Sequence, residues 1–276
     1  MATPPPDDRP PAPGTVRSHF DPAHPHVLVV TLDHPPVNAM TPDMYRQVYE
    51  IFEGLRERAE VRAVVLTGAG EKAFTAGGDV RAFAVRTPEM VADRSYRSRR
   101  AYEAVRLSPV PVVCAVDGAA FGAGFILATV SDFILATDRT RFALPEIDVG
   151  ALGGARHAAR VLPEHVMRQL ILTGERVDAA FLARFGVIRE IVAPEALLQA
   201  ALALAGRLAA KSPVLMRMRK ESLNLVQPLP FAEGYRVEQL YSQLAAAHPD
   251  AREAARAVAE RRAPLWQDDR EPDADA

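Results

Sequence analysis

The chain has 276 residues, a length that suits one large domain or a domain with a helical appendage. Its hydrophobic content of 49% and charged content of 25% are typical of a soluble globular protein. A formal net charge of −2 argues against general attraction to nucleic acid or to an anionic membrane. The single cysteine, Cys114, lies in an apolar run and cannot form an internal disulfide, so we expect a reducing, cytoplasmic location.

The two ends of the chain have the composition of solvated segments. Residues 1–14 contain six prolines and no apolar core, which predicts a disordered arm rather than a secretory signal. Residues 267–276 hold five acidic residues and predict a mobile tail. Between these ends we expect a core over 15–205 and a helical region over 206–266.

Strands and helices alternate through the first two thirds of the chain. An apolar run predicts a strand over 27–32, and a helix follows to about residue 58, with Thr41 as N-cap and Pro42 at its first position. Further strands are expected over 61–67, 110–116, 133–136 and 141–143, with helices over 88–106 and 122–129. From residue 163 onward the pattern is helical, over about 163–172, 178–184, 195–210, 213–226, 231–247 and 250–261. This order indicates an α/β fold with a helical C-terminal region.

Two glycine-rich segments are the most informative features of the sequence. Residues 74–79 (FTAGGD) follow the strand at 61–67, and residues 117–126 (DGAAFGAGFI) follow the strand at 110–116. Small residues at a strand end let a ligand approach the backbone closely. Two such ends side by side can direct two backbone N–H groups at one oxygen atom, as in an oxyanion hole that holds an enolate or a tetrahedral anion.

The two segments resemble the paired motifs of the crotonase superfamily, the enoyl-CoA hydratase/isomerase group of acyl-CoA enzymes. The resemblance runs from about residue 27 to residue 266 and includes, in the family's order, 36–40 (PVNAM), 61–70 (VRAVVLTGAG), 142–146 (FALPE), 172–176 (LTGER) and 261–266 (RRAPLW). It implies a right-handed spiral of ββα units followed by a helical trimerisation region, and a homotrimer or a dimer of trimers. The Ala- and Leu-rich helices from Ala179 onward suit a subunit interface, or equally cover the chain's own core.

The resemblance also assigns roles to individual residues. It places one oxyanion N–H on Ala76 and the other on Ala123, where a helix begins and adds the positive end of its dipole. Its segment beside pantetheine and adenosine matches residues 35–40. CoA enters as part of an acyl-CoA thioester substrate, and no metal or redox cofactor is implied. The expected substrate and CoA contacts are Val37, Ala76, Gly77, Gly78, Asp79, Gly122, Ala123 and Ile126.

Glu146 is the expected catalytic residue because it matches one of the two active-site glutamates of the family. A carboxylate beside an apolar acyl pocket is expected to have a raised pKa, so that it can accept and donate a proton near neutral pH. Hydratases of the family carry a second glutamate where this chain has Ile126, and no carboxylate lies between Asp117 and Asp132. One glutamate suffices to move a proton from C2 to C4 of an acyl group. The pattern therefore favours double-bond isomerisation or dehydration, while a true hydratase and a non-catalytic acyl-CoA-binding protein stay open.

A second departure follows Glu146. The segment 150–154 (GALGG) is about three residues shorter than the family's turn, which helps to wall the acyl pocket, so we expect a substrate other than a simple straight chain. Asp148, Arg156 and His157 lie nearby in sequence and either take part in the site or are surface residues. The arginines at 94, 97, 99 and 100 either contact CoA phosphates or form a solvated helix face.

Overall fold

The computed structural model describes residues 14–79 and 85–269, so the arm expected over 1–14, except for Gly14, and most of the expected tail lie outside the described residues. The described strands form two sheets. The larger has the order β1 (Thr15–Asp21), β2 (His24–Asp33), β3 (Ala63–Gly68), β5 (Val112–Val116), β7 (Phe133–Thr137) and β10 (Glu190–Val192). The smaller has the order β4 (Ala73–Thr75), β6 (Ala119–Phe121), β8 (Arg141–Ala143) and β9 (Val177–Asp178).

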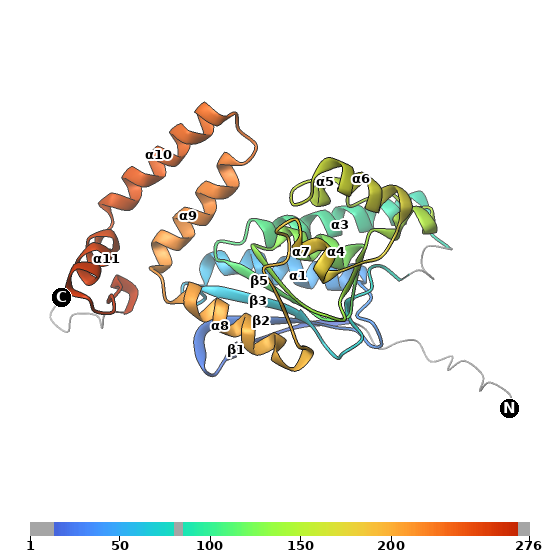
Figure 1. Ribbon diagram of the computed structural model, residues 1–276, viewed down its shortest axis with the longest axis horizontal. Helices are drawn as coiled ribbons and strands as arrows, with labels where there is room; N and C mark the ends of the chain where they lie inside the picture. The colour runs from blue at the N-terminus through green and yellow to red at the C-terminus, as the bar shows by residue number, and fades with distance from the viewer. Residues whose placement is uncertain (1–13, 80–84, 270–276) are drawn as a thin grey trace.

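The described helices follow the pattern expected from the sequence. The predicted α/β core with helices toward the C-terminus is confirmed (Figure 1). The structure adds β1, β4, β6, β9 and β10, which the sequence analysis did not predict. The helices are α1 (Pro42–Gly54), α3 (Pro88–Arg106), α4 (Ala123–Val130), α5 (Ala155–Ala158), α6 (Glu164–Thr173), α7 (Ala179–Ala183), α8 (Leu197–Ala209), α9 (Pro213–Val226), α10 (Phe231–Ala247) and α11 (Pro249–Glu260). Short 3-10 turns are η1 (Leu55–Glu57), η2 (Pro145–Val149), η3 (Pro194–Ala196) and η4 (Gln267–Asp269).

A repeated pair of strands connects the two sheets. In β3–β4, β5–β6 and β7–β8, the first strand joins the larger sheet and the second joins the smaller one. The strand β3 pairs with β5 in parallel, and so do β4 with β6 and β6 with β8. Parallel strands bring their carboxyl ends to one edge, so the segments after β4, β6 and β8 lie together.

The inner strands of the larger sheet, β2, β3, β5 and β7, are buried on both faces, which explains why they contain continuous apolar runs rather than alternating ones. On one face Leu28, Val30 and Leu32 pack in the main core with α1, α3 and α4. On the other face Val27 and Val29 pack against α8. Because α8 spans residues 197–209, this helix crosses the boundary expected between 205 and 206 and packs with the sheet.

The helices α9, α10 and α11 project to one side of the sheets (Figure 1). Two buried polar contacts attach this arm to the rest of the chain. Lys220 on α9 donates to the Val110 carbonyl oxygen (2.9 Å) and to Asp132 Oδ2 (2.6 Å). The Trp266 indole donates to the Ala210 carbonyl oxygen (3.0 Å). The first three residues of the expected acidic tail form η4, and Asp269 in this turn pairs with the buried Arg62.

Several large apolar side chains on the arm are exposed. Those of α9, α10 and the loop between them are Leu223, Leu225, Leu229, Phe231, Tyr235, Leu240 and Leu244. Within residues 14–79 and 85–269, no helix has both the length and the apolar character to cross a membrane.

Candidate active site

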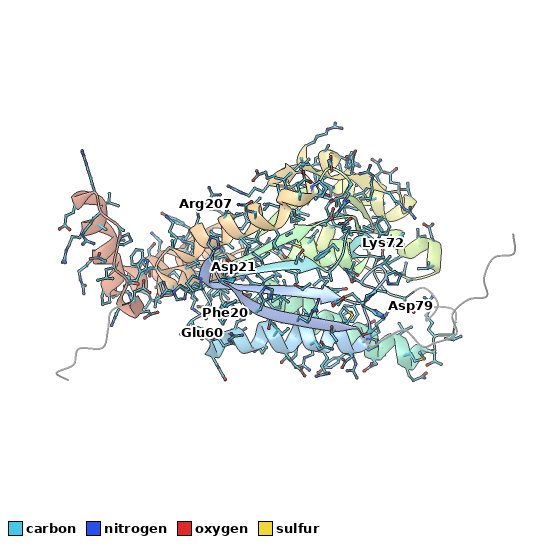
Figure 2. All side chains as sticks on the ribbon, turned by 90° about the horizontal axis from the view of Figure 1, so that it is seen from below. Phe20, Asp21, Glu60, Lys72, Asp79 and Arg207 are labelled. Atoms are coloured by element: carbon cyan, nitrogen blue, oxygen red, sulfur yellow. The ribbon has the colours of Figure 1, made fainter. Side chains whose placement is uncertain are left out.

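Two backbone turns meet at the carboxyl ends of β4 and β6. An added Cβ on Gly77 would lie 2.9 Å from the Phe121 carbonyl oxygen and 3.8 Å from the Ala123 nitrogen. A Cβ on Gly124 would lie 2.5 Å from the Thr75 carbonyl oxygen. Residues without a side chain are therefore required for the two backbones to approach this closely. Lys72 and Asp79, which flank this segment, lie at the end of the core farther from the α9–α11 arm (Figure 2).

Some backbone N–H groups of these turns donate hydrogen bonds within the protein, and others, called open donors below, have no acceptor in the part of the chain that the structure describes. The Ala76 N–H donates to the Val37 carbonyl oxygen (3.0 Å), and the Met40 N–H donates to the Gly77 carbonyl oxygen (2.8 Å). Among the described residues, the N–H groups of Gly78 and Ala123 have no hydrogen-bond acceptor. Ala123 is the first residue of α4, where N–H groups have no partner within the helix. The donor expected at Ala76 is thus engaged inside the protein, whereas Gly78 and Ala123 can each donate to a ligand.

Glu146 lies beside these two open donors. It is half-buried on η2, and a Cβ on Gly122 would lie 2.9 Å from its Oε1 atom. Its Oε2 atom is buried and has no hydrogen-bond partner in the described part of the chain. Burial raises the pKa of this carboxyl, against smaller opposing effects of its backbone hydrogen bond and of the positive charge of Arg94. The side chain therefore accepts a proton more readily than an exposed glutamate does.

A cavity of about 300 Å³ connects these groups. Among the described residues that line it, Glu146 is the only one with a carboxylate, and Ile126 contributes an apolar wall. The expected residues Ala76, Gly77, Gly78, Gly122, Ala123 and His157 also line it, as do Arg94 and Arg99.

Other expected residues lie outside the lining of this cavity. Val37 is connected to the cavity through Ala76, because its carbonyl oxygen accepts the hydrogen bond of the Ala76 N–H. Asp79 lines a neighbouring cavity of about 570 Å³, which shares Gly78 and Arg94 with the first. Asp148 is exposed, and its carboxylate packs near Gly174 instead.

The arginines on α3 divide into two groups. Arg94 and Arg99 line the cavity, whereas Arg97 pairs with Asp93 (2.7 Å) and Arg100 stacks over the Tyr49 ring at 3.7 Å. Arg97 and Arg100 therefore contact neighbouring residues on the helix surface rather than the cavity.

Two tyrosines that the sequence analysis missed form part of the cavity wall. Tyr45 on α1 and Tyr102 on α3 are buried, and their hydroxyl oxygens lie 3.3 Å apart. The Tyr102 ring also makes an edge contact with the His157 imidazole, with centroids 5.5 Å apart. Burial raises the pKa of both phenols, so both hydroxyls keep their protons at neutral pH. Both tyrosines lie on apolar helix faces, where an aromatic residue ordinarily indicates core, so no local pattern separates them from packing residues.

The chain has similar sequences and folds among known proteins. Residues 23–270 match the family model described as enoyl-CoA hydratase/isomerase. The chain is 34% identical to carnitinyl-CoA dehydratase of Citrobacter koseri, over 90% of this chain and 97% of that protein. It is 37% identical to (7aS)-7a-methyl-1,5-dioxo-2,3,5,6,7,7a-hexahydro-1H-indene-carboxyl-CoA hydrolase of Mycobacterium tuberculosis, over 78% of this chain and 87% of that protein. The crystal structure of enoyl-CoA hydratase from Bacillus anthracis superposes with a TM-score of 0.87 at 27% identity, covering 91% of this chain and 98% of that one.

The chain therefore belongs to the enoyl-CoA hydratase/isomerase, or crotonase, family of acyl-CoA enzymes, and it has the α/β crotonase fold with C-terminal helices. Relatives that share this fold carry the names of a dehydratase, a hydrolase and a hydratase. Membership thus defines the class of substrate, and the residues of the cavity must define the reaction.

The burial of Glu146 predicts a pH-dependent effect of Glu146→Gln on stability. The pKa of this carboxyl is higher in the folded chain than its ordinary value of 4.5, so its ionised form at pH 7 disfavours folding. Glutamine carries no such penalty. We expect Glu146→Gln to raise the Tm at pH 7 by about 2–4 °C, the shift that roughly 1 kcal/mol produces in a domain of similar size.

At pH 4, below the ordinary carboxyl pKa, the carboxyl is mostly protonated in both folded and unfolded chains, and most of the advantage of glutamine should be lost. Scanning calorimetry at the two pH values measures this difference. Asp148→Asn, on the same turn but outside the cavity, is the matched control and should show no gain at pH 7. An equal change in Tm for Glu146→Gln at both pH values would contradict the prediction.

Proposed function

We propose that this protein catalyses proton transfer on an acyl-CoA thioester through an enolate intermediate, with Glu146 as the single acid/base. The observation that carries the proposal is the position of Glu146. Of the described residues that line the cavity, it is the only one with a carboxylate, and it lies beside the two open N–H groups. These groups would donate to the thioester oxygen and stabilise the negative charge that develops on it. The proposal assigns the first donor to Gly78 in place of Ala76, because the Ala76 N–H already bonds to Val37.

In isomerisation, one carboxylate can both remove the proton and return it. In a 3-enoyl-CoA, Glu146 removes a proton from C2, and the electron pair of that C–H bond moves toward the thioester oxygen. The protonated Glu146 then returns the proton to C4, while the double bond moves from C3–C4 to C2–C3. No water is consumed or released, so no group that positions water is required.

Dehydration balances in the same way. Glu146 removes the C2 proton of a 3-hydroxyacyl-CoA, the C3–O bond breaks, and the proton leaves with the hydroxyl group as water. The name of the dehydratase relative supports this second reaction. A standard hydratase mechanism with two carboxylates is less well supported, because Ile126 supplies an apolar wall where a group would have to hold water. Binding of acyl-CoA without catalysis is a further alternative, and the raised pKa of Glu146 argues against it.

The exposed arm supports the assembly that the family resemblance implies, a homotrimer or a dimer of trimers. Its apolar side chains, among them Phe231, Leu240 and Leu244, would be removed from water by a second copy of the chain. The substrate in this proposal is the acyl-CoA thioester itself.

The first prediction on activity concerns the reaction and its base. The unaltered protein is offered 3-enoyl-CoA in deuterated water, and a parallel sample is offered trans-2-enoyl-CoA. We expect double-bond migration, with deuterium at C4 when the proton on Glu146 exchanges with solvent before its return and at C2 through the reverse reaction, and slower formation of 3-hydroxyacyl-CoA. Glu146→Gln should lower turnover by about 10²–10⁴-fold while acyl-CoA binding persists, because it removes the proton acceptor and keeps the shape of the side chain.

Asp148→Asn serves as the control and should keep turnover close to that of the unaltered protein. Fast hydration without double-bond migration would reject isomerisation and favour the dehydration step, because hydration of a 2-enoyl-CoA is the reverse of that step. Equal turnover by Glu146→Gln and the unaltered protein would remove Glu146 from the mechanism.

The second prediction tests the donor at Ala123. Proline is tolerated at the first position of a helix, and it lacks the N–H group. We expect Ala123→Pro to fold and to lose about 10²–10³-fold in kcat, the usual effect of removing one oxyanion donor. Ala123→Gly keeps the N–H and should keep most of the activity. Comparable kcat values in these two variants, with circular dichroism that shows both folded, would exclude this donor.

The third prediction concerns assembly. Sedimentation equilibrium should give a mass three or six times that of one chain. Changing Leu240 and Leu244 on α10 to glutamate should shift the mass toward that of a monomer, because charged groups would have to be buried at the interface. A monomeric mass for the unaltered protein at micromolar concentration would refute the proposed assembly.

A further inference from the structure

We propose that the Tyr45–Tyr102 pair selects acyl groups that carry a neutral oxygen substituent, a hydroxyl or a carbonyl, at C3 or C4. This inference rests on the proposed function, since it assumes that the thioester lies at Gly78 and Ala123 with its acyl group in the cavity of about 300 Å³. It names the substrate class that the single-glutamate site would take.

The hydroxyls of the pair leave one donor available. Each tyrosine has one O–H proton, and the two oxygens share one hydrogen bond of 3.3 Å. When one hydroxyl donates to the other, the second proton has no acceptor among the described residues. Both side chains are buried and line the cavity, so the remaining proton can reach only a group inside it. A buried donor without an acceptor costs free energy, and a substrate oxygen removes that cost.

The surroundings of the pair add to its polar character. His157 contacts the Tyr102 ring and lines the same cavity, and burial together with nearby arginines lowers the pKa of this imidazole. A neutral imidazole offers one donor and one acceptor. Ser98 also lines the cavity. This part of the wall therefore presents several uncharged hydrogen-bonding groups, which a purely aliphatic acyl chain would leave unsatisfied.

The charges of the site favour a neutral substituent over a cationic one. Arg94 and Arg99 line the cavity, and Arg106, Arg156 and Arg160 act on His157 from outside it. Five cations close to the pocket oppose a cationic acyl group such as a quaternary ammonium. An uncharged oxygen avoids this repulsion and still accepts from a tyrosine hydroxyl.

Binding measurements on matched esters test the proposal independently of turnover. Isothermal titration calorimetry is carried out on Glu146→Gln protein, so that proton transfer does not consume the ligands. The probes are butanoyl-CoA, 3-hydroxybutanoyl-CoA, 4-hydroxybutanoyl-CoA and 4-trimethylammoniobutanoyl-CoA. At least one hydroxy ester should bind about two- to tenfold tighter than butanoyl-CoA, which is the range for one net hydrogen bond, and tighter than 4-trimethylammoniobutanoyl-CoA.

The same titrations are repeated after Tyr45 and Tyr102 are changed to phenylalanine in that background. The preference for the hydroxy ester should disappear, while the affinity for butanoyl-CoA stays within about twofold. Tyr96→Phe is the matched control, because Tyr96 lies on the same helix, is exposed and bonds to Arg100 instead. Tyr102→Phe alone replaces the double variant if circular dichroism shows that the latter is unfolded, and it should weaken the preference.

Three results would overturn the proposal. They are equal affinity for butanoyl-CoA and both hydroxy esters, a preference that survives loss of the tyrosine hydroxyls, and tightest binding of 4-trimethylammoniobutanoyl-CoA. Product formed from these esters by the Glu146→Gln protein as fast as by the unaltered protein would instead count against the proposed function, so the two failures are distinguishable.

Discussion

The close approach of two backbone turns is the constraint on which the rest of the structure depends. The turn after β4 and the first residues of α4 pack with almost no side-chain volume between them, and added methyl groups at Gly77 or Gly124 would meet backbone oxygens. The parallel pairing of β4 with β6 brings these segments into contact, and the larger sheet holds both strand pairs in register. Because the constraint acts on the backbone, it fixes the direction of N–H groups without depending on side-chain rotamers.

Where the two turns meet, several polar groups have no hydrogen-bond partner among the described residues. The N–H groups of Gly78 and Ala123 and the Oε2 atom of Glu146 all lack a hydrogen-bond partner in the described residues. Such groups cost free energy when buried, and an extended core compensates for that cost. Strands buried on both faces supply most of the compensating free energy. Contacts such as that of Lys220 with Asp132 attach the arm to the core. Stability is thus concentrated in the sheets and helices, and unsatisfied groups are concentrated at the site.

The helices could be predicted well because their signals are local. Thr41 and Thr87 each accept from a backbone N–H as N-caps, and a proline follows each of them. The strands β4 and β6 could not be predicted in the same way, since each has three residues and its order comes from its neighbours in the sheet. The local motif indicated that the segment 76–78 consists of alanine and glycine, without bulky side chains. Which of its N–H groups stays open depends on the segment 37–40, which lies far from it in sequence.

The sequence by itself determined the family, the order of elements and the absence of a carboxylate at Ile126, because motifs, caps and apolar runs are properties of neighbouring residues. Only the tertiary structure decided which groups share the cavity. Val37 engages the Ala76 N–H, burial of Glu146 raises its pKa, and packing of α1 against α3 joins the hydroxyls of Tyr45 and Tyr102. Each of these depends on distances between segments that are far apart along the chain, and such distances are set by packing rather than by local pattern.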